Sequence, residues 1–312
     1  MVKKLFFAVL AALAMVGCNE KSVEVSEMKP GEKIQLTVKL PEGVTKVTGA
    51  PADAQVNDLQ IFVFDKNGVY ETSSHGTGAT LTLTCTSGEK QIVALVNAPL
   101  ETGIDNIAEL GASVSDLADC AAGNIVMSGM VVKELTASST LTMEVERLAA
   151  KVGVSQISTA FELDQHKQMT FDIKAIYLIN VAGEKAYLDQ NEPSKWYNLG
   201  KHDTGNTLGF LRDDVASGVI AAGSSYTNEH YFYCYPNLTD TKTRLVVEAV
   251  VGGYTYYYPV TLDAVDANTS YDYNLTITRL GSDSPDVPVE EGTVTFTVTV
   301  KDWVQQNVNE TI

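Results

Sequence analysis

Basic residues are scarce in this chain of 312 residues. Only 22 lysines and arginines stand against 39 aspartates and glutamates, so the formal net charge is −17. A chain this acidic repels the phosphate backbone of DNA and RNA, which argues against nucleic acid as a partner. The acidity otherwise indicates solubility and mutual repulsion, and by itself it identifies no ligand.

Residue patterns that carry catalysis or bind metals are also missing. None of the short spacings that hold a metal ion occurs among the four histidines, His75, His166, His202 and His230. Ser74 precedes a histidine but lacks the glycines of a nucleophile elbow. The adjacent acids Asp213 and Asp214 are more typical of a solvated loop than of a cation site. We therefore expect no enzyme activity, no cofactor and no metal.

Cysteine is rare as well, with four in the chain. Cys18 lies in the N-terminal segment, which leaves Cys85, Cys120 and Cys234 for the folded part. No two of these form a C-x-x-C pair, and three thiols cannot make a disulfide framework. We expect buried thiols, and the sequence leaves open whether any two of them form a disulfide.

The only long apolar run is at the N-terminus. Two lysines precede the apolar stretch 5–16, which is too short for a stable membrane span and leads into Gly17 and Cys18. A small residue directly before a cysteine at such a place is typical of a bacterial lipoprotein signal. We expect a signal peptide over 1–17, cleavage between Gly17 and Cys18, and lipidation of Cys18. The lipid would then be the only membrane anchor.

The chain does contain many short stretches in which apolar and polar residues alternate. This pattern predicts strands at 33–40, 59–64, 80–86 and 91–96, from 139 onward, and at 169–181, 230–235, 243–250, 254–262 and 271–280. Helical signals are confined to about 104–121, and the polar insertion 183–229 receives no structural assignment. Many short strands with turns between them predict an all-β fold with a β-sandwich in each half.

Composition and strand pattern divide the chain into consecutive parts. Residues 18–32 are polar and are expected to form a tether, and we place the boundary between the two sandwiches near residue 149. The N-terminal sandwich covers 33–148, and the C-terminal sandwich covers 149–303. The remaining segment, 304–312, is predicted to be a separate C-terminal strand.

The last twenty residues carry the most informative strand pattern. Four apolar residues alternate with threonines: Val294, Phe296, Val298 and Val300. After a break at 301–303, three more lie on one face of an extended chain: Val304, Val308 and Ile312. An unpaired apolar strand invites pairing with another chain. We expect 293–300 to be a resident strand of the second sandwich and 304–312 to be the exchangeable part.

Several motifs follow one another in a characteristic order after the lipoprotein signal. They are N-D-L-Q-I-F-V-F-D-K-N-G at 57–68, I-V-A-L-V-N-A-P at 92–99, V-M-S-G at 126–129, V-E-R-L-A-A-K-V at 145–152, F-Y-C-Y-P-N at 232–237, N-L-T-I-T-R-L-G-S-D at 274–283 and V-T-V-K-D-W at 298–303. In this order and spacing the chain resembles the fimbrillins, the type V pilins that Bacteroidales display as lipoprotein precursors. The resemblance covers almost the whole chain.

The resemblance implies two tandem transthyretin-like β-sandwiches and a structural role in an adhesive fimbria. In this family a surface protease cuts the loop after the first strand, the strand leaves, and the C-terminal strand of another subunit fills the vacated groove. By this resemblance the leaving strand carries Ile34, Leu36, Val38 and Leu40, and the donor strand carries Val304, Val308 and Ile312. The implied partners are other pilin subunits, a surface protease, the outer-membrane lipid anchor and host or bacterial surface receptors.

One position departs from the family pattern. The processed loop usually carries Thr-Arg, whereas this chain has Thr45-Lys46, and its first arginine is Arg147. Lys46 is therefore a candidate cleavage site for a protease that accepts lysine. The competing interpretation is an ordinary solvated loop lysine in a subunit that is not processed in this way.

Two other functions remain open. Within the same family, the chain is alternatively an anchor or a tip subunit. From a different class, it is a surface glycan-binding lipoprotein that stacks its tyrosine-rich segment on sugars: Tyr254, Tyr256, Tyr257 and Tyr258. The competing interpretation of that segment, which we favour, is a strand packed on a sheet.

Overall fold

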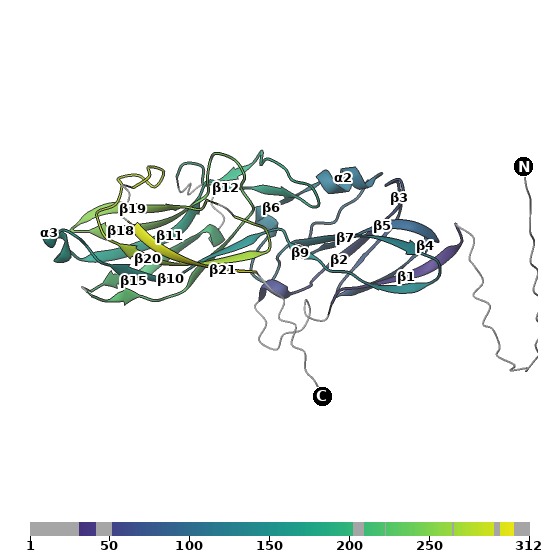
Figure 1. Ribbon diagram of the computed structural model, residues 1–312, viewed down its shortest axis with the longest axis horizontal. Helices are drawn as coiled ribbons and strands as arrows, with labels where there is room; N and C mark the ends of the chain where they lie inside the picture. Colours follow the sequence, from purple (N-terminus) through teal and green to yellow (C-terminus); the bar gives the residue numbers. More distant parts are fainter. Residues whose placement is uncertain are drawn as a thin grey trace, which may run out of the picture.

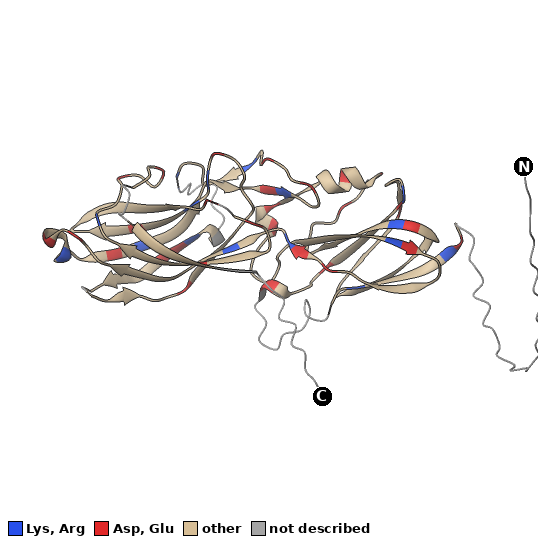
Figure 2. Cartoon of the chain, viewed as in Figure 1, with Lys and Arg blue, Asp and Glu red and all other residues tan. Residues whose placement is uncertain are grey.

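The computed structural model describes residues 31–41, 52–201, 209–221, 223–263, 265–289 and 294–302. The fold is all-β, as predicted, and Figure 1 shows two sandwich halves lying end to end. Lysine and arginine are interspersed with aspartate and glutamate along both halves (Figure 2). Among the described residues, no helix is long and apolar enough to cross a membrane.

The N-terminal half consists of two sheets. The first sheet has the order β4 (Thr80–Thr86), β1 (Lys33–Lys39) and β8 (Ser139–Thr142). The second has the order β3 (Tyr70–Gly76), β2 (Leu59–Asp65), β5 (Gly88–Val96), β7 (Met127–Leu135) and β9 (Glu146–Arg147). The apolar side chains that face each other across these sheets form one core cluster. β1 is thus a central strand, with a neighbour on each side.

Strand β2 is buried on both faces, because a second layer covers the outside of its sheet. Phe62 and Phe64 point to that outer side, where they join a cluster with residues from the segment that holds α2 (Ile107–Ala112), β6 (Val114–Asp116) and η2 (Leu117–Asp119). Helix α2 begins after Asn106, whose side chain accepts a hydrogen bond from the Glu109 amide and so caps the helix. This helix falls within the predicted helical segment.

The C-terminal half is also built from two sheets. One contains β16 (Ser225–Tyr226) and β17 (His230–Cys234) beside β10 (Ala150–Thr159), then β20 (Thr269–Ile277) and β21 (Val294–Asp302). The other has the order β15 (Arg212–Ile220), β11 (Phe171–Ile179), β18 (Arg244–Val251) and β19 (Tyr254–Thr261). The short helices α3 (Asp164–Lys167) and η3 (Gly209–Leu211) lie in the connections. The strands predicted at 230–235, 243–250, 254–262 and 271–280 are all present.

The later part of the insertion 183–229, which the sequence left unassigned, supplies β15 and β16 to the C-terminal sheets. Its first part, together with the two residues before it, forms an arm between the two halves. This arm contains β12 (Val181–Ala182), β13 (Glu184–Ala186) and β14 (Trp196–Tyr197). β13 pairs antiparallel with β6 of the N-terminal half, and the Ser128 hydroxyl donates to the Tyr187 carbonyl at 2.5 Å. Because these are contacts between distant parts of the chain, local sequence pattern does not report them.

A buried polar cluster fastens the halves together on another side. Asp53, in η1 (Ala52–Ala54), is only 3% exposed. Its carboxylate accepts from Nζ of Lys151 at 3.1 Å and from the Tyr233 hydroxyl, and its carbonyl accepts from Nε of Arg147 at 3.1 Å. The cluster therefore ties the segment just before β2 to β9, β10 and β17.

We expect Asp53→Asn to lower the free energy of unfolding by about 3 kcal/mol, because Lys151 and Tyr233 lose a charged acceptor in a buried site. Urea unfolding followed by circular dichroism measures the change. The matched control is Asp164→Asn, which breaks an exposed ion pair with Lys167 and should cause no measurable change. Equal effects of the two substitutions would contradict a structural role for the buried cluster.

Candidate functional site

The seat of strand β1 is the best-defined candidate site in the N-terminal half. Counting Leu40, which directly follows its last residue, four alternate residues of this strand point into the core and are almost fully buried: Ile34, Leu36, Val38 and Leu40. They pack against inward residues of β2 and β5, such as Ile61 and Ile92. We call the space that these side chains fill, between β4 and β8, the β1 slot.

The backbone of β1 is paired along both edges. It runs antiparallel to β4 over seven residue pairs, from Lys33 opposite Thr86 to Lys39 opposite Thr80. It runs parallel to β8 over four pairs, from Leu36 to Lys39. Backbone bonds continue the antiparallel ladder beyond the strand ends, for example from Leu40 N to Ala79 O at 2.9 Å. β1 is therefore fixed both by its side chains and by two ladders.

The outer face of β1 is polar and makes only light contacts. The hydroxyls of Thr37 and Thr82 lie 2.9 Å apart, and Nε2 of Gln35 donates to Oγ1 of Thr84 at 2.8 Å. Both pairs are exposed to solvent. Among the side chains of β1, those of the inward face therefore do most to hold the strand, in agreement with the alternation of the sequence.

Several predicted site residues lie outside the described part of the chain. They are Gly17 and Cys18 of the lipoprotein signal, the candidate cleavage residue Lys46, and the donor residues Val304, Val308 and Ile312. The described chain resumes at Ala52 after β1, and its last strand ends at Asp302. These predictions stay predictions.

Strand β21 is the outer strand of its sheet and is poorly covered. It pairs antiparallel with β20 over nine residue pairs, from Thr269 opposite Asp302 to Ile277 opposite Val294. Its side chains Phe296 and Val298 are 46% and 38% exposed. The residues that they pair with on β20, Leu275 and Tyr273, are buried. The strand predicted at 293–300 is therefore part of the second half, but its apolar face is only partly covered there.

His230 and the acids Asp213 and Asp214, which lie in β15 rather than in a loop, have internal partners. Nδ1 of His230 lies 2.9 Å from Oδ2 of Asp213, and its Nε2 lies 2.8 Å from the Tyr226 hydroxyl. Asp214 accepts from Arg212 at 2.7 Å. Among the described residues, no group of three or more His, Cys, Asp or Glu side chains has a geometry that holds a metal ion.

The three cysteines of the folded part are buried and unpaired. Cys85, Cys120 and Cys234 form no disulfide with one another. Burial raises the pKa of the Cys120 thiol to about 11 and that of Cys234 to about 12. These two thiols are therefore protonated at neutral pH and behave as apolar side chains, as the sequence suggested.

The tyrosine-rich strand β19 is largely part of the structure. Tyr258 is fully buried and contacts the ring of Phe171 at 5.5 Å between centroids, and Tyr256 packs against the main core cluster. Only Tyr254 is mostly exposed, at 71%. This arrangement agrees with the favoured interpretation of a strand packed on a sheet.

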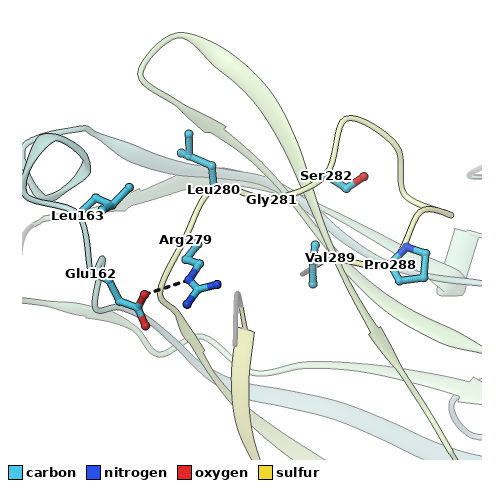
Figure 3. A pocket seen from close by; sticks show the side chains of 8 residues that line it. All are labelled: Glu162, Leu163, Arg279, Leu280, Gly281, Ser282, Pro288 and Val289. Atoms are coloured by element: carbon cyan, nitrogen blue, oxygen red, sulfur yellow. Dashed lines mark hydrogen bonds and ion pairs between the residues drawn. The ribbon is translucent and has the colours of Figure 1, made fainter. Parts of the chain in front are cut away.

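A cavity of about 570 Å³ lies beside the loop that follows β20 (Figure 3). Its lining combines the apolar side chains of Leu163, Leu280 and Val289 with one ion pair, in which Nε of Arg279 donates to Oε2 of Glu162 at 2.9 Å. Figure 3 shows that these two charged side chains point toward each other. Their polar atoms are engaged in a bond within the protein.

Several solved structures are similar in fold to this chain over most of its length. A fimbrilin from Porphyromonas gingivalis W83 is similar over 87% of this chain and 98% of its own, with 15% identity and a TM-score of 0.62. A candidate cell adhesion protein from Parabacteroides distasonis ATCC 8503 covers 88% of this chain and all of its own, with 16% identity and a TM-score of 0.68. A tip fimbrial protein, Mfa3 of P. gingivalis with a C-terminal truncation, gives 13% identity, 87% and 100% coverage, and a TM-score of 0.56. The fold is that of the fimbrillins.

The sequence points to the same family. Residues 34–167 match the model of the family described as major fimbrial subunit protein (FimA). That range begins at the first inward residue of β1 and includes the whole sandwich around the β1 slot. No curated protein matches the chain. The predicted resemblance to the fimbrillins is therefore confirmed.

We expect Leu36→Ala to lower the free energy of unfolding by about 3 kcal/mol, because it leaves a cavity where the side chain is fully buried. Thr37→Ala, at the neighbouring outward position of the same strand, should cost less than about 1 kcal/mol. Urea unfolding of the two variants measures the difference. A larger loss for Thr37→Ala than for Leu36→Ala would contradict the assignment of the inward face.

Proposed function

We propose that this chain is a structural subunit of an adhesive surface fimbria that polymerises by strand exchange at the β1 slot. It is exported as an outer-membrane lipoprotein attached through Cys18 and then enters the fimbria at the cell surface. The observation that carries this proposal is β1 itself: a central strand with four buried side chains, joined to the rest of the fold through residues 42–51. The match to the FimA family supports the same conclusion.

The energetics of the slot favour replacement of β1 over an empty groove. Fully burying each branched apolar side chain contributes roughly 1.5–3 kcal/mol, and β1 has four such residues. An empty slot would also leave the edges of β4 and β8 unpaired, and such edges attract another strand. A contact from the end of one subunit to the slot of the next does not close on itself, so repetition produces a fibre.

The two halves of the chain have different roles in this proposal. We propose transthyretin-like sandwiches over 33–148 and 149–303, with the first receiving the donor strand. The boundary near residue 149 is supported by strand pairing, because the strands from β10 onward pair among themselves apart from the arm strand β13. Other pilin subunits are then the main partners, and surface receptors are bound by the assembled fimbria.

The donor strand is assigned to 304–312, where Val304, Val308 and Ile312 share one face. Strand 294–300 offers a second match, because its four apolar residues recur at every second position, as do those of β1. Phe296 and Val298 are also half exposed in their present place. An experiment therefore has to separate these two segments.

The alternative roles have less support. A tip role within the same family is suggested by the likeness to the Mfa3 tip protein, which extends to the fold alone. An anchor subunit would keep both its lipid and β1. A glycan-binding lipoprotein would need several accessible tyrosines, but in β19 only Tyr254 is largely exposed.

Cleavage at Lys46 should trigger assembly. Brief treatment of the purified precursor with a low dose of trypsin should cut at Lys46 and give a ladder of SDS-resistant multimers on a gel. Lys46→Ala should abolish both the cut and the ladder. The matched control is Lys66→Ala in the exposed turn between β2 and β3, which should change neither. Efficient cutting at Lys46 without multimers would oppose the stalk role.

Removal of residues 304–312 should abolish multimers while the monomer keeps its circular dichroism spectrum and melting temperature. The donor would then be missing although the slot is intact. A second variant, Phe296→Ser with Val298→Ser, should assemble normally if 304–312 is the whole donor. Loss of assembly in that variant alone would move the donor assignment to 294–300, and normal assembly after the deletion would refute the assignment to 304–312.

A further inference from the structure

The two strands that border the β1 slot are attached to the protein in different ways. Among the described residues, β4 and β8 have β1 as their only partner strand. Each therefore loses its ladder when β1 leaves. The remaining attachments decide which of the two strands keeps its position.

Strand β4 has a second attachment at its end. The amide of Thr86 donates to Oε1 of Glu71 at 2.5 Å, and Nζ of Lys90 donates to Oγ1 of Thr86 at 2.8 Å. Glu71 and Lys90 are also paired with each other at 2.5 Å. Glu71 belongs to β3 and Lys90 to β5, both in the opposite sheet. We call these three residues the Thr86 clamp.

The ion pair of the clamp is largely shielded from solvent. Lys90 is 5% exposed, and the side chain of Glu71 is 21% exposed. An ion pair in such a place retains its geometry because loss of either partner leaves a charge without compensation. None of the bonds of the clamp involves β1, so the departure of β1 removes none of them. The end of β4 therefore stays fixed to the opposite sheet.

Strand β8 has no comparable attachment. Within the described residues, no hydrogen bond joins Ser139–Thr142 to the opposite sheet. The bonds beside its two ends come from β1: Gln35 N donates to Ser138 Oγ at 2.9 Å, and Met143 N donates to Lys39 O at 3.0 Å. Leu141 is only partly buried. For its hydrogen bonds, β8 thus depends on β1 far more than β4 does.

We propose that the Thr86 clamp holds β4 in place when β1 is absent, so that an incoming strand pairs first with β4 and runs antiparallel to it. This inference rests on the proposed exchange at the β1 slot. The β4 edge offers seven pairs against four on β8, and antiparallel pairing is slightly more stable per residue than parallel pairing. The partner that fits is an extended segment with branched apolar residues at every second position, in the direction of β1. Glu71 and Lys90 act as positioning residues through Thr86.

Direction can be measured in the full-length chain. A recognition sequence for a site-specific protease is placed in 42–51, and the cut protein is incubated with an excess of a dye-labelled peptide of residues 31–41. The peptide carries a photo-crosslinker in place of Lys33, a position opposite Thr86 in β1. Crosslinks mapped by mass spectrometry should fall on residues around Thr86. Crosslinks at the Thr80 end, or no capture by the cut protein, would overturn the proposal.

The clamp itself is tested by Glu71→Leu combined with Lys90→Met. Replacing both members of a buried ion pair with apolar residues tends to preserve folding. We expect this double variant to capture the peptide about tenfold more slowly, since the charged bonds that hold Thr86 are gone, and to crosslink at both ends of β4. Glu71→Gln keeps an oxygen for the Thr86 amide and should retain the direction of the peptide. Unchanged rate and crosslink positions in the double variant would overturn the proposal.

The matched control is Asp53→Asn, which disturbs another buried ion pair away from the slot and should capture the peptide as the unmodified protein does. Slower capture by this variant, to the same extent as by the double variant, would overturn a specific role for the clamp. Because the peptide has the sequence of β1, the test does not depend on which segment is the natural donor. Normal, directional peptide capture without multimers would count against the proposed function and leave the clamp intact.

Discussion

Strand β1 has to satisfy two requirements at once: its backbone completes the ladders of two neighbours, and its side chains complete a core. Leu36, Val38 and Leu40 are fully buried, and within the part of the chain that the structure describes, β4 and β8 pair with no other strand than β1. When a central strand of this kind is removed, the fold loses two backbone ladders and part of its core at the same time. A substitute strand is therefore needed. The rest of the N-terminal half is arranged around this one strand, and a strand from elsewhere with the same alternation meets the same requirements.

The connection between the halves limits where any rearrangement occurs. The main core cluster runs without interruption from Phe62 and Phe64 of β2 to residues of β10 and β20. The arm strand β13 and the Asp53 cluster add two further connections. Asp53 comes shortly after the segment that links β1 to the rest of the chain. β1 precedes Asp53 in the chain, and the Asp53 cluster holds the following segment in place. Exchange of β1 is therefore compatible with a fold that otherwise keeps its shape.

The sequence predicted those features that a single segment encodes and missed those that depend on partners. Alternation at 33–40 correctly indicated a strand with one buried face, because period-two patterns report burial directly. The same rule predicted a strand at 293–300 but could not predict that Phe296 would be 46% exposed, since this depends on what lies opposite. The strands β13 and β14, within the insertion 183–229, were left unassigned because such short strands are defined by pairing with other segments, in β13 with the distant β6. The bonds of Asp53 join residues far apart in the sequence, and those of the Thr86 clamp join three successive strands, so no pattern within a single segment marks them.

The unequal attachment of β4 and β8 bears on the kind of fibre that the subunits form. If a strand entered the slot in either direction, neighbouring subunits would be joined in two different orientations, and the filament would be irregular. A fixed β4 edge that imposes an antiparallel partner leaves one orientation. Each subunit then adds to the last in the same way, as a head-to-tail contact requires. By fixing Thr86 at the end of β4, the buried Glu71–Lys90 pair thus sets the direction of the incoming strand, and with it the regularity of the fibre.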